Sequence, residues 1–236
     1  MYKGLSVLGF IPARAGSKGL PGKNTKPLAG KPLLLYSVEA GQKSGVFDYL
    51  MVSTDGEDIA AVARQGGAEA PFIRPPELAT DTAKVVDALH HTMRWLEDQG
   101  RRYDCLAVLQ PTSPLRGAED ITGALDLFVE RGADAVVSVC ETEHHPWWSN
   151  TLPDDGCMEG FLRSDISVNR QELPKFYRLN GSIYLALWDF IRERRSWFGP
   201  RTYAYVMPRH RSVDIDNPLD FFLAEALITE MRDAEI

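Results

Sequence analysis

Cysteine is scarce in this sequence: Cys105, Cys140 and Cys157 are the three among its 236 residues. Their odd number and the lack of a C-x-x-C spacing indicate neither a disulfide framework nor a cysteine-ligated zinc site. The cytoplasm, a reducing compartment, is therefore the simplest location to expect.

Long hydrophobic runs and an excess of positive charge are also missing. The first apolar run, at 5–11, is too short for a membrane-spanning helix and has no small-residue cleavage site before a mature start, so we interpret it as a strand. The 26 Lys and Arg residues stand against 33 Asp and Glu, a net charge of −7. This balance argues against nucleic acid or an anionic membrane as the main partner, but it allows an anionic small molecule where basic residues gather.

Apolar runs of strand length alternate with segments of helical periodicity as far as Cys140. The strand-length runs lie at 5–12, 49–53, 104–109 and 134–139, and the helical segments at 32–43, 57–66, 83–98 and 118–131. The alternation predicts an α/β fold with three layers, in which a mostly parallel, twisted, Rossmann-like sheet lies between helices. Ligands bind such folds beyond the carboxyl ends of the strands, so functional residues should follow the strands directly.

The alternation stops at 141–180, which shows little periodicity. We interpret this segment as an arm inserted into one domain that spans 1–236. Regular structure is expected again as strands at 182–187 and 202–206, a short extended segment at 213–216 and a closing helix at 218–231.

A loop rich in glycine and lysine follows the first strand, at 13–24. Its glycines let backbone N–H groups approach phosphate oxygens, and Arg14, Lys18 and Lys23 would neutralise their charge. The loop does not match G-x-G-x-x-G, and its first and last glycines are one residue too far apart for G-x-x-x-x-G-K-[ST]. We expect a polyphosphate loop that does not by itself specify the nucleotide; a basic surface loop without a ligand is the alternative.

Five motifs occur in one order along the chain. They are the loop at 13–24, Ser53-Thr54-Asp55-Gly56, Arg74-Pro75-Pro76-Glu77-Leu78-Ala79, Gln110-Pro111-Thr112-Ser113-Pro114-Leu115-Arg116 and Asp214-Ile215-Asp216. Together they resemble the acylneuraminate cytidylyltransferases, over nearly the whole chain. The resemblance implies a nucleotidyltransferase fold and an enzyme that joins CMP from CTP to a nine-carbon 2-keto sugar acid, such as N-acetylneuraminic, legionaminic or pseudaminic acid, with release of pyrophosphate. It also implies a homodimer formed through the arm at 141–180.

The resemblance assigns nucleotide contacts to residues of the first loop and of the two segments after it. They are Ala13, Arg14, Ser17, Lys18, Lys23, Asn24, Asp55, Arg74 and Thr82. We expect Lys23 and Arg14 to be catalytic, because cations there would stabilise charge on the phosphates as pyrophosphate leaves. Members of the family often carry two serines after the Thr-Ala pair, where this chain has Lys84 and Val85, so a hydroxyl that could contact phosphate is replaced by Val85.

An acidic pair near the end of the chain is the candidate metal site. Asp214 and Asp216 lie two apart on a segment expected to be extended, so both carboxylates would point to one face and could share Mg²⁺. With the resemblance we interpret both as catalytic metal ligands, although Asp-x-Asp is also common at exposed strand ends.

The sugar acid needs a partner for its carboxylate, and guanidinium groups bind carboxylates in bidentate fashion. The resemblance places Arg170 and Arg178 near the substrates, with Gln110, Asn180 and Tyr184 on the sugar side.

Other interpretations stay open. A synthetase for the eight-carbon acid Kdo or another sugar nucleotidyltransferase would share the fold, and a regulator that binds nucleotide without turnover should lack Lys23 or one of the two aspartates. The missing glycine fingerprint argues against a dehydrogenase. His144 and His145 have no third zinc ligand at a suitable spacing, and the neighbouring Trp147 and Trp148 fit either a subunit interface or the chain's own core. No histidine is an evident general base: two lie on the helix expected at 83–98, and one precedes the acidic pair without a partner.

Overall fold

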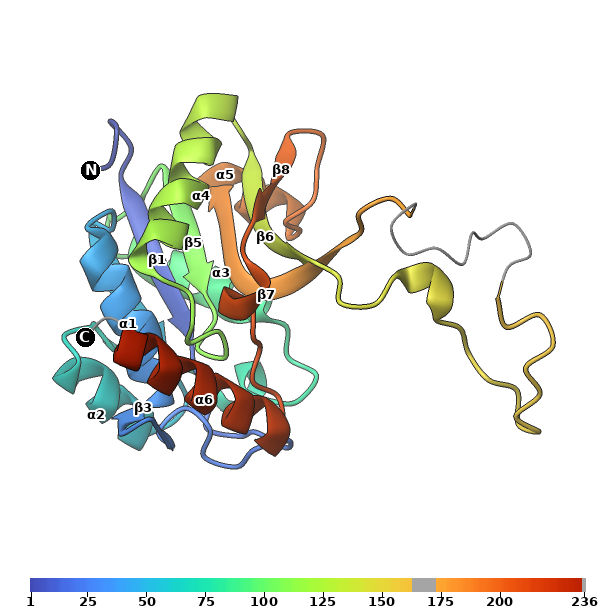
Figure 1. Ribbon diagram of the computed structural model, residues 1–236. Helices are drawn as coiled ribbons and strands as arrows, with labels where there is room; N and C mark the ends of the chain where they lie inside the picture. The colour runs from blue at the N-terminus through green and yellow to red at the C-terminus, as the bar shows by residue number, and fades with distance from the viewer. Residues whose placement is uncertain (163–172, 235–236) are drawn as a thin grey trace.

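The computed structural model describes residues 1–162 and 173–234, and its centre is a six-stranded sheet in the order β4-β1-β5-β7-β6-β8 (Figure 1). The strands are β1 (Val7–Pro12), β4 (Tyr49–Ser53), β5 (Cys105–Leu109), β6 (Ala135–Glu141), β7 (Tyr177–Leu187) and β8 (Thr202–Val206). Strand β7 runs antiparallel to both of its neighbours, while the other pairs are parallel. The predicted mostly parallel sheet is confirmed.

Helices cover both faces of the sheet. One buried cluster joins it to α1 (Leu33–Ser44), α2 (Glu57–Gln65) and α4 (Ala118–Arg131). The opposite cluster joins it to α3 (Val85–Glu97) and α5 (Trp188–Arg194). The three-layer arrangement expected from the sequence is therefore present.

The remaining elements lie beyond these layers. They are the hairpin of β2 (Pro27–Leu28) and β3 (Lys31–Pro32), the helix α6 (Pro218–Ala234) and the single turns η1 (Pro76–Leu78), η2 (Pro146–Trp148) and η4 (Arg209–Arg211). Helix α6 packs on a third buried cluster that includes Leu28 and Ile215.

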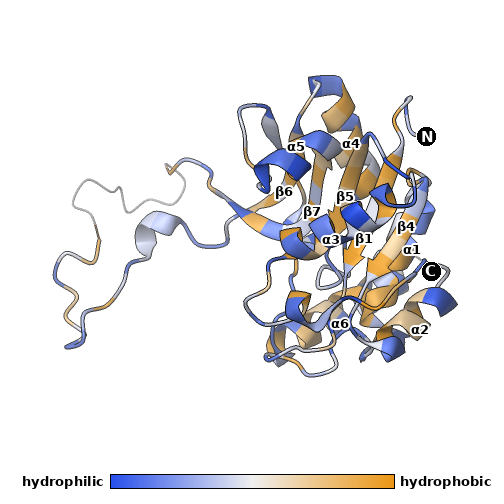
Figure 2. Ribbon diagram, turned by 180° about the vertical axis from the view of Figure 1, so that it is seen from behind, coloured by the Kyte–Doolittle hydropathy of each residue, from blue (hydrophilic) through white to orange (hydrophobic). Residues whose placement is uncertain are grey.

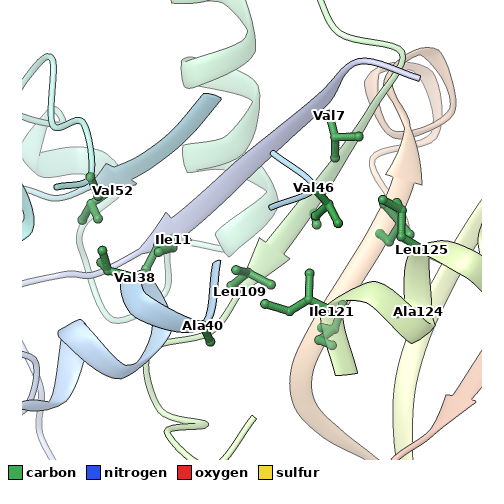
Figure 3. Packing of buried hydrophobic residues seen from close by; sticks show 14 of the residues in the cluster. Val7, Ile11, Val38, Ala40, Val46, Val52, Leu109, Ile121, Ala124 and Leu125 are labelled. Atoms are coloured by element: carbon green, nitrogen blue, oxygen red, sulfur yellow. The ribbon is translucent and has the colours of Figure 1, made fainter. Parts of the chain in front are cut away.

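Strand β1 shows why the first apolar run is continuous rather than alternating. Val7 and Ile11 enter the cluster beside α1 and α4, whereas Leu8 and Phe10 enter the cluster beside α3. Figure 3 shows Ile11 beside Val38 of α1. Since both faces are buried, every position of the strand favours an apolar side chain, and each large one contributes about 1.5–3 kcal/mol by leaving water.

Residues 142–162, which follow β6, extend away from the sheet in both views (Figures 1 and 2). Strand β7 begins at Tyr177, inside the predicted arm, because Tyr177 and Arg178 pair with the end of β6. At the base of the arm, the buried His145 ring lies 4.9 Å from Trp147 and 4.5 Å from Phe176, centroid to centroid. Trp147 thus packs within the arm itself.

The predicted extended segment at 213–216 is not part of a sheet, and one helix was missed. Residues 213–216 form no strand: Ile215 donates one backbone hydrogen bond to Thr112 (2.8 Å), and Asp216 and Asn217 turn to donate to the Asp220 carboxylate at the start of α6. Helix α5 was not predicted, because seven residues are too few to show helical periodicity. No helix within residues 1–162 and 173–234 is long and apolar enough to span a membrane.

Candidate active site

Three neighbouring parallel strands, β4, β1 and β5, end at the same edge of the sheet. The loops that follow them border a cavity of about 240 Å³, which we call the inner cavity. Five predicted site residues line it: Arg14, Lys23, Asn24, Arg74 and Gln110. Segments far apart in the sequence meet here because the carboxyl ends of parallel strands lie together.

Glycine and an amide shape the first loop. A Cβ on Gly19 would lie 2.1 Å from the backbone oxygen of Asp216, so only glycine lets the loop approach the acidic segment so closely. The Asn24 amide donates to the backbone oxygen of Arg14 (2.8 Å) and ties the two ends of the loop together. Ser17 lies half-buried within the loop.

Lys23 links the first loop to the acidic segment. Its ammonium donates to the backbone oxygen of Ile215 (2.7 Å) and lies 3.5 Å from the Asp216 carboxylate. The Lys23 side chain is only 12% exposed, whereas that of Asp216 is 76% exposed. The cation is therefore held at the wall of the inner cavity by a backbone contact that does not neutralise it.

Asp214 lies beside Lys23 with one carboxylate oxygen, Oδ1, buried and without a hydrogen-bond partner. Burial raises the pKa of Asp214 above its ordinary value; Thr112 donates to the carboxylate and opposes the rise. The charge of Asp216 raises the pKa further, while Lys23 and Arg178 lower it. The group therefore lies where an added cation would stabilise its ionised form.

The acidic pair suits a hard divalent cation that takes only one or two of its ligands from the protein. In the described part of the chain no three His, Cys, Asp or Glu side chains gather as a metal site. Magnesium commonly uses one or two carboxylates and completes its shell with water and substrate phosphates. Asp214, with its unpartnered buried oxygen, and Asp216 could hold it in that way.

Asp81 is a functional candidate that the sequence did not reveal. Its carboxylate lies 3.1 Å from Arg14 and 2.7 Å from Lys18, and Arg14 also donates to the backbone oxygen of Thr80 (3.0 Å). The hydrogen bond from Lys18 lowers the pKa of Asp81. A carboxylate thus pairs with two cations of the predicted phosphate loop, a contact visible only once the two loops lie together.

Asp55 joins the loop after β4 to the loop after β1. Its Oδ1 accepts from the Ala15 backbone (2.8 Å) and lies 3.7 Å from the Arg74 guanidinium. Burial lowers the pKa of Arg74, and the charge of Asp55 opposes that change. Buried Ala13 donates its N–H to Ser53 (2.9 Å).

Thr82 lies on an exposed part of the next loop. Its hydroxyl is 3.4 Å from that of Thr80, which lines the inner cavity, whereas Thr82 is not among the lining residues.

A second cavity of about 370 Å³ adjoins the first, and we call it the outer cavity. The two share Lys84, Val85 and Gln110. Tyr184 also lines the outer cavity, and burial raises its pKa, with the charge of Asp214 adding to the rise. The sequence predicted no role for Lys84, which borders both cavities.

The other residues predicted for the sugar side have different positions. Arg178 is exposed and donates to the backbone oxygen of Ser212 at 3.4 Å. Asn180 is fully buried, accepts from the Ser138 hydroxyl (2.6 Å) and donates to that of Ser212 (2.9 Å). Its amide therefore stabilises β7 through these two serines and is not available to a substrate. Arg170 lies outside the described residues.

Arg116, the last residue of the motif after β5, has a structural role. It is buried and donates to the backbone oxygens of Gln110 (3.2 Å) and Ser182 (2.9 Å) and to the Ser37 hydroxyl (2.6 Å). Burial lowers its pKa to about 10. The residue thus fixes the segment that carries Gln110.

The cytidylyltransferase family model matches residues 8–233. The chain belongs to the cytidylyltransferase family. The predicted resemblance and the predicted enzyme class are confirmed, and Lys23, Asp214 and Asp216, which a regulator without turnover was expected to lack in part, lie near one another in this cytidylyltransferase.

Several named relatives resemble this cytidylyltransferase over most of its length. The CMP-N,N'-diacetyllegionaminic acid synthase of Legionella pneumophila is 38% identical over 232 residues, which cover 98% of this chain and 99% of that one. The pseudaminic acid cytidylyltransferase of Campylobacter jejuni is 32% identical over 218 residues, which cover 92% and 94%. An N-acylneuraminate cytidylyltransferase of Streptococcus agalactiae is 38% identical over 90% of this chain but 51% of its own, so this chain spans about half the length of that relative.

The fold also matches a solved structure, a CMP:2-keto-3-deoxy-manno-octonic acid synthetase complexed with CTP. The TM-score is 0.70 at 16% identity, and the match covers 96% of this chain and 99% of the other. At that identity the likeness concerns the fold alone, and it confirms the predicted nucleotidyltransferase architecture.

Proposed function

We propose that this cytidylyltransferase transfers CMP from CTP to the anomeric hydroxyl of a nine-carbon 2-keto sugar acid and releases pyrophosphate. The observation that carries the proposal is the pair of adjoining cavities. The inner one is lined by Arg14, Lys23 and Arg74, cations suited to a triphosphate, and the outer one opens beside it across Gln110. The relatives named for diacetyllegionaminic, pseudaminic and N-acylneuraminic acids support the choice of acid.

Phosphoryl-type transfer depends mostly on positioning and on neutralising charge. We infer that Lys23 and Arg14 stabilise charge on the departing pyrophosphate, and that the amides of the first loop, with Ser17 and Lys18, hold its oxygens. Asp55, Arg74, Thr82 and the Ala13 backbone are the proposed contacts for cytosine and ribose.

Asp214 and Asp216 would hold Mg²⁺. A bound magnesium ion would supply charge neutralisation on the phosphates. The unpartnered Oδ1 of Asp214 supports this assignment.

For the sugar acid, we propose that Arg178, together with Arg170, binds the carboxylate, and that Gln110 and Tyr184 contact the ring. Asn180 would act by holding β7 rather than by touching substrate, since its amide already bonds two serine hydroxyls.

We also propose that the chain is one nucleotidyltransferase domain that dimerises through its arm. The arm carries Leu152, Met158 and Leu162, which are 60%, 58% and 50% exposed. Exposed apolar side chains gathered on one segment are typical of an interaction surface. The free cysteines, among them the exposed Cys157, support a cytoplasmic location.

Pyrophosphate release tests the function directly. The protein is incubated with CTP, MgCl₂ and one acid at a time from N-acetylneuraminic, legionaminic, pseudaminic and Kdo acids, with ATP, GTP and UTP as control nucleotides. We expect release that needs both CTP and a nine-carbon acid. Release with Kdo alone, or release that any nucleotide supports equally, would contradict the proposal.

A further inference from the structure

The outer cavity has an apolar wall. Val85 and Val86 begin α3, Leu179 lies on β7, and Trp197 and Phe198 lie on the turn between α5 and β8. Leu179 and Phe198 are 49% and 55% exposed, a large fraction for such side chains. Apolar surface that is left open around a cavity favours an apolar part of a ligand.

The turn that carries this wall is fixed by its own hydrogen bonds. The Thr202 hydroxyl donates to the backbone oxygen of Trp197 (3.0 Å) and accepts from the N–H of Gly199 (2.9 Å). The Trp197 ring also lies 5.3 Å from that of Tyr184, centroid to centroid. The aromatic wall is therefore in place before any substrate arrives.

Two polar residues that line the cavity next to the aromatic wall, Arg195 and Ser196, already have protein partners. Arg195 pairs with the Asp87 carboxylate, and the Ser196 hydroxyl oxygen accepts from the N–H of Phe198 (3.2 Å). A ligand segment rich in hydroxyl groups would lose its hydrogen bonds to water against this wall and gain few in return. Methyl groups, including the methyl of an acyl group, would lose nothing of the kind.

We propose that the outer cavity selects nine-carbon 2-keto sugar acids that carry a second N-acyl group and a methyl terminus over acids that carry a polyhydroxylated side chain. The inference rests on the proposed function, since it concerns the acceptor of the same reaction. N,N'-diacetyllegionaminic acid has this pattern, and N-acetylneuraminic acid has hydroxyls at the two corresponding carbons. Val85, which stands where the resembled family often has serine, removes one further hydroxyl from the boundary of the two cavities.

The first test compares kcat/KM for the two acids at saturating CTP, with pyrophosphate release as the readout. We expect the diacylated, deoxygenated acid to be favoured by about 10- to 100-fold, the range that apolar pockets achieve. Equal values, or a preference for N-acetylneuraminic acid, would overturn the inference and leave the proposed function intact. Release with neither of these acids nor with pseudaminic acid would overturn both.

Two variants locate the selectivity. Phe198→Ser and Val85→Ser each place a hydroxyl on the wall, and we expect each to reduce the ratio of the two kcat/KM values about fivefold or more, mainly by improving use of N-acetylneuraminic acid. Because Val85 also borders the inner cavity, KM for CTP is measured in parallel. Phe222→Ser is the matched control, since Phe222 is 69% exposed on α6 and should leave the ratio unchanged. An unchanged ratio in both wall variants would overturn the inference even if the wild type prefers the diacylated acid.

Discussion

Lys23 combines two properties that a catalytic cation needs. It is nearly buried, and its main partner is the neutral backbone oxygen of Ile215 rather than a carboxylate. Its charge therefore remains available to a phosphate at the cavity wall. We expect Lys23→Met, which keeps most of the side chain's length but not its charge, to lower kcat about 10²- to 10³-fold, as removal of a positioned electrostatic group does elsewhere.

The control for this change is Lys26→Ala. The Lys26 ammonium lies 5.5 Å from the centre of the Phe221 ring and does not line the inner cavity. Steady-state rates and circular dichroism are measured for both variants. A kcat for Lys23→Met within threefold of the wild type would remove Lys23 from the catalytic scheme.

Asp81 forms ion pairs with Arg14 and Lys18, the two cations that we expect to bind the triphosphate. Its pairs with Arg14 and Lys18 must open if both cations are to bind phosphate oxygens. We expect Asp81→Asn to lower KM for CTP about two- to fivefold, the scale of exposed ion pairs, with little change in kcat. The measurement is CTP-dependent pyrophosphate release, and Asp98→Asn, at the end of α3, is the control. A higher KM in Asp81→Asn would mean that the carboxylate assists CTP binding.

At the scale of elements, the arm and β7 form one continuous unit. The strand starts at Tyr177 and continues past Leu179 and Tyr184, which line the outer cavity. The arm is therefore anchored on the same strand that borders the candidate sugar site.

The proposed dimer gives a test of the arm. We expect a combined change of Leu152, Met158 and Leu162 to serine to shift the protein from dimer to monomer, because their exposed apolar surface would no longer favour association. Analytical ultracentrifugation at several concentrations measures the shift, and Leu219→Ser, an exposed site on α6, is the control. If the triple variant sediments like the wild type, the arm does not hold the subunits together.

The longer helices and the strands of the central sheet were predictable from the sequence, and the short helices were not. Twelve or more residues of helical spacing, as in α1 and α4, fix an amphipathic pattern, whereas α5 and the turns at η1, η2 and η4 are decided by tertiary packing. Strand β7 was anticipated only from 182, since its first residues are exposed and pair with β6 outside the core.

The candidate site was predictable where one motif follows one strand. Arg14, Lys23, Asn24, Arg74 and Gln110 all line the inner cavity as the parallel topology requires. The pairing of Asp81 with Arg14 could not be foreseen, because it joins two loops that approach only after folding. The buried role of Asn180 was likewise hidden, since a polar residue beside a motif looks the same whether it supports the sheet or faces a ligand.

For the whole molecule, two histidines of α3 predict sensitivity to acid. Burial lowers the pKa of His90 and of His91 below the ordinary 6.5, and the Nε2 of His90 lies 3.0 Å from the backbone oxygen of Ile191. The neutral rings are favoured in the folded state, so their contribution is present above pH 6.5 and is lost as pH falls through the lower, folded-state values.

We expect the melting temperature to fall by about 2–4 °C or more between pH 7.5 and 5.5, the shift that 1 kcal/mol gives in a chain of this size. His90→Gln should show a smaller fall over that range, and His210→Gln, with an exposed side chain, should follow the wild type. Differential scanning calorimetry across the pH series measures this. Parallel curves for wild type and His90→Gln would assign the acid sensitivity to other groups.

The contact between Lys23 and Ile215 has a consequence for folding during synthesis on the ribosome. The two residues are 192 positions apart, and Gly19 touches Asp216 across a similar span. At about 5–20 residues per second, ribosomes need roughly 10–40 seconds to add the second partner after the first. During that interval the nascent chain carries its phosphate loop without the segment that holds Lys23, so a chain that stalls before residue 214 should lack both the acidic pair and the backbone partner of Lys23, even if the core of the sheet has already folded.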